Sequence, residues 1–138
     1  MPPLDYLDTN VFIRHLTQDE PQMAQQARSL FKQLETGQAT ATTCEGVIVE
    51  AVQVLSSRAL YNLPRPQIRQ HLGNLLSLKG LHLPRKRVYL RALDLYATSS
   101  LDFVDALIVA HMERDRATAV ISFDRDFDQF AQITRRQP

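Results

Sequence analysis

Four carboxylates stand out in this sequence because apolar residues surround them. Asp8 lies in LDTNVFI, Glu50 in VIVEAVQVL, Asp105 in FVDALIVA and Asp124 in VISFDRDF. Most of the fifteen acidic residues lie instead in ordinary polar stretches. Acids are seldom buried without a partner, because taking an ionised carboxylate out of water costs much free energy unless a counter-charge compensates. We therefore expect the four carboxylates to converge on one site.

Carboxylates that gather in this way predict a metal-dependent chemistry. They repel one another and raise one another's pKa unless a cation neutralises them. Ligation by oxygen alone suits Mg²⁺ or Mn²⁺, whereas zinc prefers histidine and cysteine. The reaction that uses such sites is phosphoryl transfer, in which the metal activates water and stabilises charge on the phosphate.

Each of the four residues also has a purely structural interpretation. Asp8 fits the N-cap of a turn that starts after it. Glu50 fits one half of a buried pair with an arginine. Asp105 fits a first-turn acid that complements the helix dipole. Asp124 fits a turn residue, and its neighbours Asp126 and Asp128 offer alternative carboxylates.

Two further acids close to these motifs favour structural roles. Asp102 is interpreted as the N-cap of the last long helix, with a ligand role as the alternative. Glu45 is interpreted as a first-turn acid. Other residue types offer little support for different chemistry. The histidines are scattered and show no metal-binding spacing, and His111 is expected to be a partly exposed helix residue. Cys44 is expected to be a small core residue. With only four glycines, the chain has no nucleotide-binding loop.

Composition limits the classes of protein to which this chain can belong. A chain of 138 residues with 44% hydrophobic and 22% charged residues predicts one globular domain, residues 1–138. No apolar run is long enough for a bilayer, and the first residues lack the pattern of a signal peptide. The single cysteine fits a reducing compartment, so we expect a cytoplasmic protein.

The positive charge is unevenly distributed. No Asp or Glu occurs between Ala51 and Leu93, and eight basic residues fall there: Arg58, Arg65, Arg69, Lys79, Arg85, Lys86, Arg87 and Arg91. Such a stretch favours a polyanion such as RNA or DNA, or it forms the solvated faces of surface helices.

Strands and helices alternate along the chain. Strands are expected at 4–8, weakly at 39–43, clearly at 117–123 and again at 131–134; helices are expected from Pro21 to Gly37, over 44–60, around 68–80, after Pro84 and over 103–115. On the helix after Pro21, the apolar residues expected to form the buried face are Met23, Ala27, Leu30, Phe31 and Leu34. Apolar strands alternating with helices predict an α/β fold with a mostly parallel sheet and helices on both faces. Ligands of such folds bind at the carboxyl ends of the strands, where Asp8 and Asp124 lie.

The four motifs together resemble those of a known family. LDTNVFIR at 7–14, VIVEAVQVL at 47–55, LDFVDALIVAHM at 101–112 and VISFDRDF at 120–127 are similar, in order and spacing, to the four acidic motifs of the PIN-domain nucleases. The similarity is closest to the VapC-type toxins of type II toxin–antitoxin modules, and it covers nearly the whole chain.

The resemblance implies a fold, a metal and partners. It implies a three-layer α/β/α sandwich and a Mg²⁺-dependent endoribonuclease, with Mn²⁺ as a substitute. Asp8, Glu50, Asp105 and Asp124 would be the metal-binding and catalytic quartet, Thr9 and Asn10 would support the first motif, and Ser122 would stand where the family often has Ser or Thr. A homodimer and inhibition by a cognate antitoxin are implied as well. An RNA-processing enzyme or an inactive nucleic-acid-binding module is the alternative.

Overall fold

The computed structural model describes residues 3–138 and contains six α-helices, one short 3-10 helix and four short strands within that range. The chain divides into two compact units, the first ending at Lys86 and the second running from Arg87 to Pro138. None of the helices within the described range is long and apolar enough to cross a membrane.

The first unit contains one parallel strand pair. Strand β1 (Asp5–Tyr6) pairs with β2 (Ala41–Thr42), with Asp5 opposite Ala41 and Tyr6 opposite Thr42. A single parallel bridge joins Ala41 to Leu81 and so adds the segment around Leu81 to β2. The Leu7 amide extends the pairing by donating to the Thr42 carbonyl at 2.8 Å. Asp8 therefore follows directly on the carboxyl end of β1.

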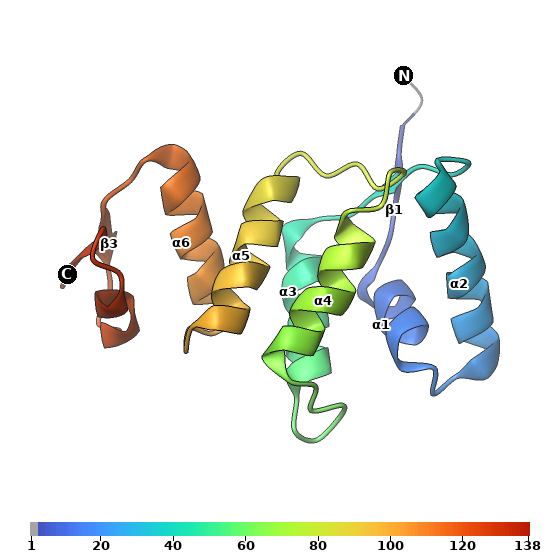
Figure 1. The fold of residues 1–138 in the computed structure, drawn as a ribbon, viewed down its shortest axis with the longest axis horizontal. Helices are drawn as coiled ribbons and strands as arrows, with labels where there is room; N and C mark the ends of the chain where they lie inside the picture. Colours follow the sequence, from blue (N-terminus) through green and yellow to red (C-terminus); the bar gives the residue numbers. More distant parts are fainter. Residues whose placement is uncertain (1–2) are drawn as a thin grey trace. The chain divides into compact units, whose positions relative to one another are not determined.

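Four helices complete the first unit. They are α1 (Thr9–Thr17), α2 (Pro21–Thr36), α3 (Glu45–Ser56) and α4 (Arg65–Leu76). Helix α1 packs against α2 and α3, and α3 packs against α4 (Figure 1). The core of the unit consists of apolar side chains from all four helices and from the segment after α4: Phe12, Leu34, Ile48, Leu55, Ile68, Leu72, Leu76 and Leu81.

Local signals in the sequence set the ends of α2. Pro21 occupies the first turn, where its missing amide leaves no hydrogen bond unmade. Gly37 ends the helix with a φ of 83°, a conformation that costs glycine little because it has no Cβ. Both boundaries confirm the sequence prediction. Helix α3, by contrast, stops at Ser56 and α4 at Leu76, each about one turn short of the predicted end.

The second unit contains α5 (Lys86–Thr98), which begins at the boundary, α6 (Phe103–Asp115), β3 (Ala119–Ile121), the 3-10 helix η1 (Arg125–Gln129) and β4 (Thr134–Arg136). Strands β3 and β4 pair in parallel, with Val120 opposite Arg135. The Tyr96 ring meets Phe103 edge-on at a centroid distance of 5.9 Å. Helix α6 has the bounds predicted from the sequence. The last strand was predicted at 131–134 and lies instead at 134–136.

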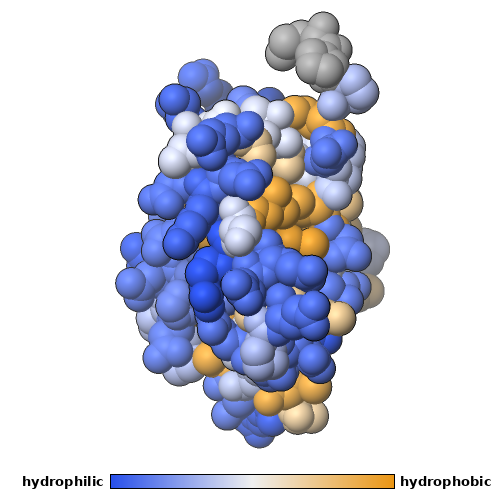
Figure 2. Space-filling view, turned by 90° about the vertical axis from the view of Figure 1, so that its right-hand side faces the viewer, coloured by the Kyte–Doolittle hydropathy of each residue, from blue (hydrophilic) through white to orange (hydrophobic). Residues whose placement is uncertain are grey.

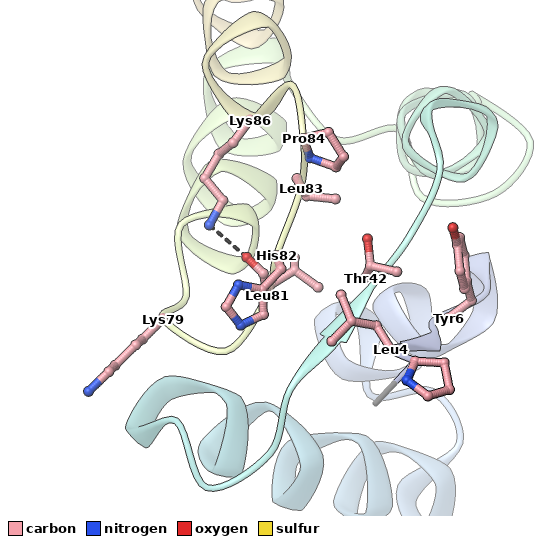
Figure 3. Close-up of a pocket in the computed structure, with 10 residues that line it drawn as sticks. Leu4, Tyr6, Thr42, Lys79, Leu81, His82, Leu83, Pro84 and Lys86 are labelled. Atoms are coloured by element: carbon pink, nitrogen blue, oxygen red, sulfur yellow. Dashed lines mark hydrogen bonds between the residues drawn. The ribbon is translucent and has the colours of Figure 1, made fainter. Parts of the chain in front are cut away.

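The predicted α/β class with parallel strand pairing is confirmed, but the strands are shorter and more exposed than expected. The strand predicted at 4–8 was expected to be buried, which was wrong, because Tyr6 is 73% exposed. The strand predicted at 117–123 is confirmed as β3, and its Ile121 is 71% exposed. In the first unit, the face of β1 that carries Leu4 and Tyr6 borders an open pocket of about 770 Å³ (Figure 3). Lys86 reaches into the same region, where its ammonium donates to the Leu81 carbonyl at 2.7 Å.

Two predicted core residues lie on the surface. Met23 is 52% exposed, and the buried face of α2 contains Ala24 instead. Met23 lines a shallow groove with Val11 and Leu30, and the face of the molecule that carries α2 shows a hydrophobic patch within a mostly hydrophilic surface (Figure 2). Cys44 is exposed because it is the N-cap of α3 and precedes the buried side of that helix.

Candidate metal centre

The N-terminus of α6 brings two carboxylates together. Asp102 is the N-cap, and its Oδ1 accepts a hydrogen bond from the Asp105 amide at 3.0 Å. Asp105 occupies the first turn and is half-buried, between the buried residues of the helix and the solvent. Both structural interpretations made from the sequence are therefore confirmed, because Asp102 caps the helix and Asp105 is a first-turn acid. Neither role excludes a function for the carboxylates.

The loop after β3 supplies a third carboxylate to the same place. The Asp124 amide donates to Ser122 Oγ at 2.9 Å, and Asp124 Oδ1 accepts from the Asp126 amide at 2.8 Å. Asp124 is thus the N-cap of η1, in the loop that follows the carboxyl end of β3. Ser122 is the polar residue that fixes the backbone of Asp124. Asp126 contributes its amide to this turn and is exposed.

The three carboxylates interact. Burial raises the pKa of Asp105, and the negative charges of Asp102 and Asp124 raise it further, to about 6. Hydrogen bonding with the side chains of Asp102 and Asp124, which favours the neutral form of Asp105, raises its pKa in the same direction. Such a shift indicates that the carboxylates compete for positive charge, because a bound proton relieves their repulsion. A divalent cation would relieve it in the same way.

Sequence analysis missed one residue beside this cluster. Arg135, on β4, donates to both carboxylate oxygens of Asp128 and to the Ser122 carbonyl at 3.3 Å. The hydrogen bond to Asp128 raises the pKa of Arg135, and the charges of Asp128 and Asp124 raise it further. Arg135 therefore joins β4 to the loop that carries Asp124. The signal in the sequence was weak, since Arg135 is one of two arginines in an unremarkable polar tail.

Asp8 lies in the first unit, at the start of α1. Its Oδ1 accepts a hydrogen bond from the Asn10 amide at 3.0 Å, so the N-cap interpretation is confirmed. Thr9, the first residue of α1, is buried, and Asn10 beside it is exposed. Asp8 itself is exposed, which means that its carboxylate is held by the helix terminus and remains open to a ligand.

Glu50 lies on the solvent side of α3. The buried side of this helix consists of Ile48, Ala51, Val52 and Leu55, while Val47 and Val54 beside Glu50 are only half-buried. The interpretation of Glu50 as part of a buried pair with an arginine was wrong, because the exposed carboxylate keeps its hydration. Of the four candidate acids, only Asp105 is withdrawn from solvent, so the expected burial applies to that residue alone.

The four predicted acids thus fall into two groups. Asp105 and Asp124 come together in the second unit, with Asp102 as an additional neighbour. Asp8 and Glu50 belong to the first unit. Convergence of all four on one metal stays a prediction.

The donor chemistry of the cluster in the second unit fits a hard divalent cation. Its ligating atoms are carboxylate oxygens only, which Mg²⁺ and Mn²⁺ prefer. Throughout residues 3–138, however, no group of three or more His, Cys, Asp or Glu side chains is arranged so that it could hold a metal as it stands. Asp102, Asp105 and Asp124 therefore form a charge cluster rather than a completed coordination sphere, and further oxygen ligands would have to complete it.

Comparison with known proteins identifies the family. The model of the PIN domain matches residues 6–133, which span all four acidic motifs and nearly the whole chain. A search of curated proteins found no match.

Proposed function

This chain belongs to the PIN-domain family, and on that premise we propose that it is a Mg²⁺-dependent endoribonuclease. The family is one of nuclease-type folds that generally act on RNA or DNA with a divalent metal. The observation that carries the proposal is the carboxylate cluster at the start of α6, where Asp105 has its pKa raised to about 6. Perturbed acids of this kind concentrate at functional sites, because ordinary surface acids keep their usual pKa.

The proposed site consists of the four acids predicted from the sequence. Asp8, Asp105 and Asp124 would hold the metal, and Glu50 would act as a further ligand or orient the attacking water. When bound, Mg²⁺ or Mn²⁺ would supply positive charge to the phosphate and lower the pKa of water. The helix termini that carry Asp8, Asp105 and Asp124 support this role, because hydrogen bonds from backbone amides fix the backbone around each carboxylate.

A ribonuclease also needs affinity for its polyanionic substrate, and basic residues supply it. Arg58 and Lys79 of the first unit are exposed, within the stretch that lacks acids. Contacts between such cations and phosphates dominate the affinity of nucleic-acid-binding proteins and are independent of base sequence. We propose that they hold the RNA backbone, while the carboxylate site acts on one phosphodiester bond.

The finer assignment rests on the resemblance of the four motifs to VapC-type toxins. We propose that the protein is the toxin of a toxin–antitoxin pair, that it acts as a homodimer in the cytoplasm, and that a cognate antitoxin inhibits it. Growth arrest on expression, relieved when a neighbouring small open reading frame is co-expressed, would support this assignment. Normal growth, with accumulation of unprocessed RNA when the gene is deleted, would favour an RNA-processing nuclease instead.

The decisive experiment is cleavage of a mixed RNA pool by the purified chain. We expect cleavage with Mg²⁺ or Mn²⁺, none in excess EDTA, and recovery when metal is restored. Asp105→Asn should abolish cleavage, whereas Asp115→Asn, at the far end of the same helix, should leave it unchanged. Cleavage that persists in EDTA would refute the mechanism. RNA binding without cleavage under any metal condition would support the alternative of an inactive binding module.

A further inference from the structure

We infer that the open pocket beside β1 is a binding site for single-stranded RNA, with a base stacked on Tyr6 and phosphates held by the basic residues that line the pocket. The inference rests on the proposed function, since RNA is the substrate proposed there, and it adds a site for nucleotides beside the bond that is cut. Every residue that lines this pocket belongs to the first unit. Its volume of about 770 Å³ lies within the usual size range of ligand-binding clefts.

The ionisable side chains that line the pocket are basic. Three of them lie on one side of it: Lys79, His82 and Lys86 (Figure 3). Leu4 and Tyr6 lie on the other side. Among the described residues that line the pocket, none is an Asp or a Glu. A pocket of this charge favours an anionic ligand over a neutral or a cationic one.

The ammonium group of Lys86 lacks an acidic partner. The residue is half-buried, and its ammonium donates to the Leu81 carbonyl at 2.7 Å. Burial lowers the pKa of Lys86, and no carboxylate among residues 3–138 contributes in the opposite direction. One carbonyl compensates only part of the hydration that a charged ammonium loses. A phosphate beside Lys86 would supply the missing negative charge.

Tyr6 offers the flat aromatic surface on which a base can stack. Its side chain is 73% exposed at the edge of the pocket. The other three tyrosines of the chain are partly or fully buried: Tyr61, Tyr89 and Tyr96. Aromatic rings of single-strand-binding proteins stack with any base, so an exposed ring beside lysines suits RNA. An acidic peptide would match the lysines but would have no need of the ring, and for this reason we favour RNA.

The pocket leads toward Asp8 along one face of β1. Tyr6 and Asp8 are exposed and Leu7 between them is buried, as the alternation of side chains along an extended chain requires. Two residues of extended chain span roughly 7 Å. RNA stacked on Tyr6 would therefore continue directly to the acid of the first unit that we propose as a metal ligand.

The test is binding of a fluorescently labelled single-stranded RNA of mixed sequence to the full chain, measured by fluorescence anisotropy in EDTA. EDTA prevents the proposed cleavage and so separates binding from activity. Tyr6→Ala should weaken binding about fivefold or more, because the stacking of one base is lost. Tyr6→Phe keeps the ring and should bind as the wild type does. Leu60→Ala, at an exposed apolar position outside the pocket, is the control.

The salt dependence of the same binding tests the role of Lys86. Lys86→Gln should reduce the slope of log affinity against log salt concentration by about 0.7, the value for one phosphate contact on a single strand. Lys86→Arg keeps the charge and should restore the slope. Lys32→Gln, at an exposed position of α2 outside the pocket, should leave the slope unchanged. Circular dichroism shows whether each variant is folded.

The outcomes separate this site from the proposed activity. Wild-type RNA affinity in both Tyr6→Ala and Lys86→Gln would overturn the inference, and cleavage of RNA by these variants with Mg²⁺ would leave the proposed nuclease intact. Polyglutamate that displaces the labelled RNA as well as unlabelled RNA does would overturn it in favour of an acidic protein partner. RNA binding with the expected losses, but without cleavage by the wild type in Mg²⁺, would support the site and refute the proposed activity.

Discussion

Asp105 on helix α6 and Asp124 in the loop beyond β3 lie close enough to interact: after burial and the charge of Asp102, the charge of Asp124 raises the pKa of Asp105. Like charges placed near each other favour binding of a proton or a cation, because either relieves their repulsion. The structure thus brings together the third and fourth acidic motifs of the chain.

The first prediction concerns the titration of Asp105 in metal-free protein. Its carboxyl group should titrate with a midpoint near 6 because burial and the charges of Asp102 and Asp124 raise its pKa. Asp124→Asn should lower the midpoint, since it removes one of these charges. Carbon-13 NMR of the carboxyl group measures the midpoint directly. Asp115→Asn is the control, and a midpoint near 4 in the wild type would contradict the prediction.

The same shift predicts how stability depends on pH. The folded pKa of Asp105 lies above the model value of 3.8, so the folded state binds the proton more tightly than the unfolded state does. The contribution of Asp105 to stability is therefore fully present below pH 3.8 and is lost as pH rises through about 6. Urea unfolding of metal-free Asp105→Asn at pH 7.5 should show a higher midpoint than that of the wild type. Added Mn²⁺ should stabilise the wild type and not the variant.

The second prediction concerns cooperation among the four acids. If one metal binds to all of them, Asp8→Asn and Asp105→Asn should each lower Mn²⁺ affinity at least about tenfold, and the double variant should lose much less than the sum of the two effects. Glu35→Gln, on the exposed face of α2, is the matched control. Independent, additive losses would indicate that the two units bind metal separately or that only one of them does.

The third prediction concerns His15, on α1. Its ring lies against Phe31 of α2 at a centroid distance of 4.7 Å, and its Nδ1 is buried without a hydrogen-bond partner among the described residues. Burial lowers the pKa of His15, and the charge of Arg28 lowers it further. Protonation therefore favours the unfolded state, and stability should fall as pH drops below 6.5 through the folded pKa.

His15→Phe removes this ionisable group and keeps an aromatic ring beside Phe31. Urea unfolding at pH 7.5 and pH 5.5 should show a smaller loss of stability at the lower pH in this variant than in the wild type. His71→Gln, at an exposed position of α4, serves as the control. An equal loss in the His15 variant and the wild type would assign the acid sensitivity to other groups.

The fourth prediction concerns Gly80, which lets the segment after α4 approach α2. A Cβ at this position would lie 2.2 Å from the Ala39 carbonyl oxygen and 2.9 Å from that of Leu34. Both neighbours are backbone atoms, and the Gly80 amide donates to the Leu34 carbonyl at 2.7 Å. Gly80→Ala should therefore force the two segments apart and cost about 3 kcal/mol or more in the free energy of unfolding.

Gly46→Ala is the matched control for this change. Gly46 lies in the first turn of α3, and a Cβ there would meet nothing within 4 Å. Alanine should stabilise the helix by roughly 0.5 kcal/mol, because glycine loses more backbone entropy on folding. Chemical denaturation of both variants measures the difference. Equal stability of the two variants would show that the approach at Gly80 is less tight than the structure has it.

Sequence alone determined the features that depend on neighbours in the chain. Pro21 and Gly37 bound α2, and Asp102 caps a helix that runs from 103 to 115, as predicted. These signals are reliable because capping and turn formation involve residues only a few positions apart. The order and spacing of the four acidic motifs likewise led to the family, which the match over residues 6–133 shows.

Only the tertiary structure decided which acids meet and which side chains are buried. Apolar neighbours in the sequence suggested burial for all four acids, yet Asp8, Glu50 and Asp124 are exposed and only Asp105 is half-buried. Its raised pKa arises from contacts between α6 and the loop after β3, and no local pattern reports a contact of that kind. The spacing of the motifs therefore located the carboxylates along the chain. The packing of α6 against the loop after β3 brought Asp102, Asp105 and Asp124 together and so determined the negative charge at the place where a cation would bind.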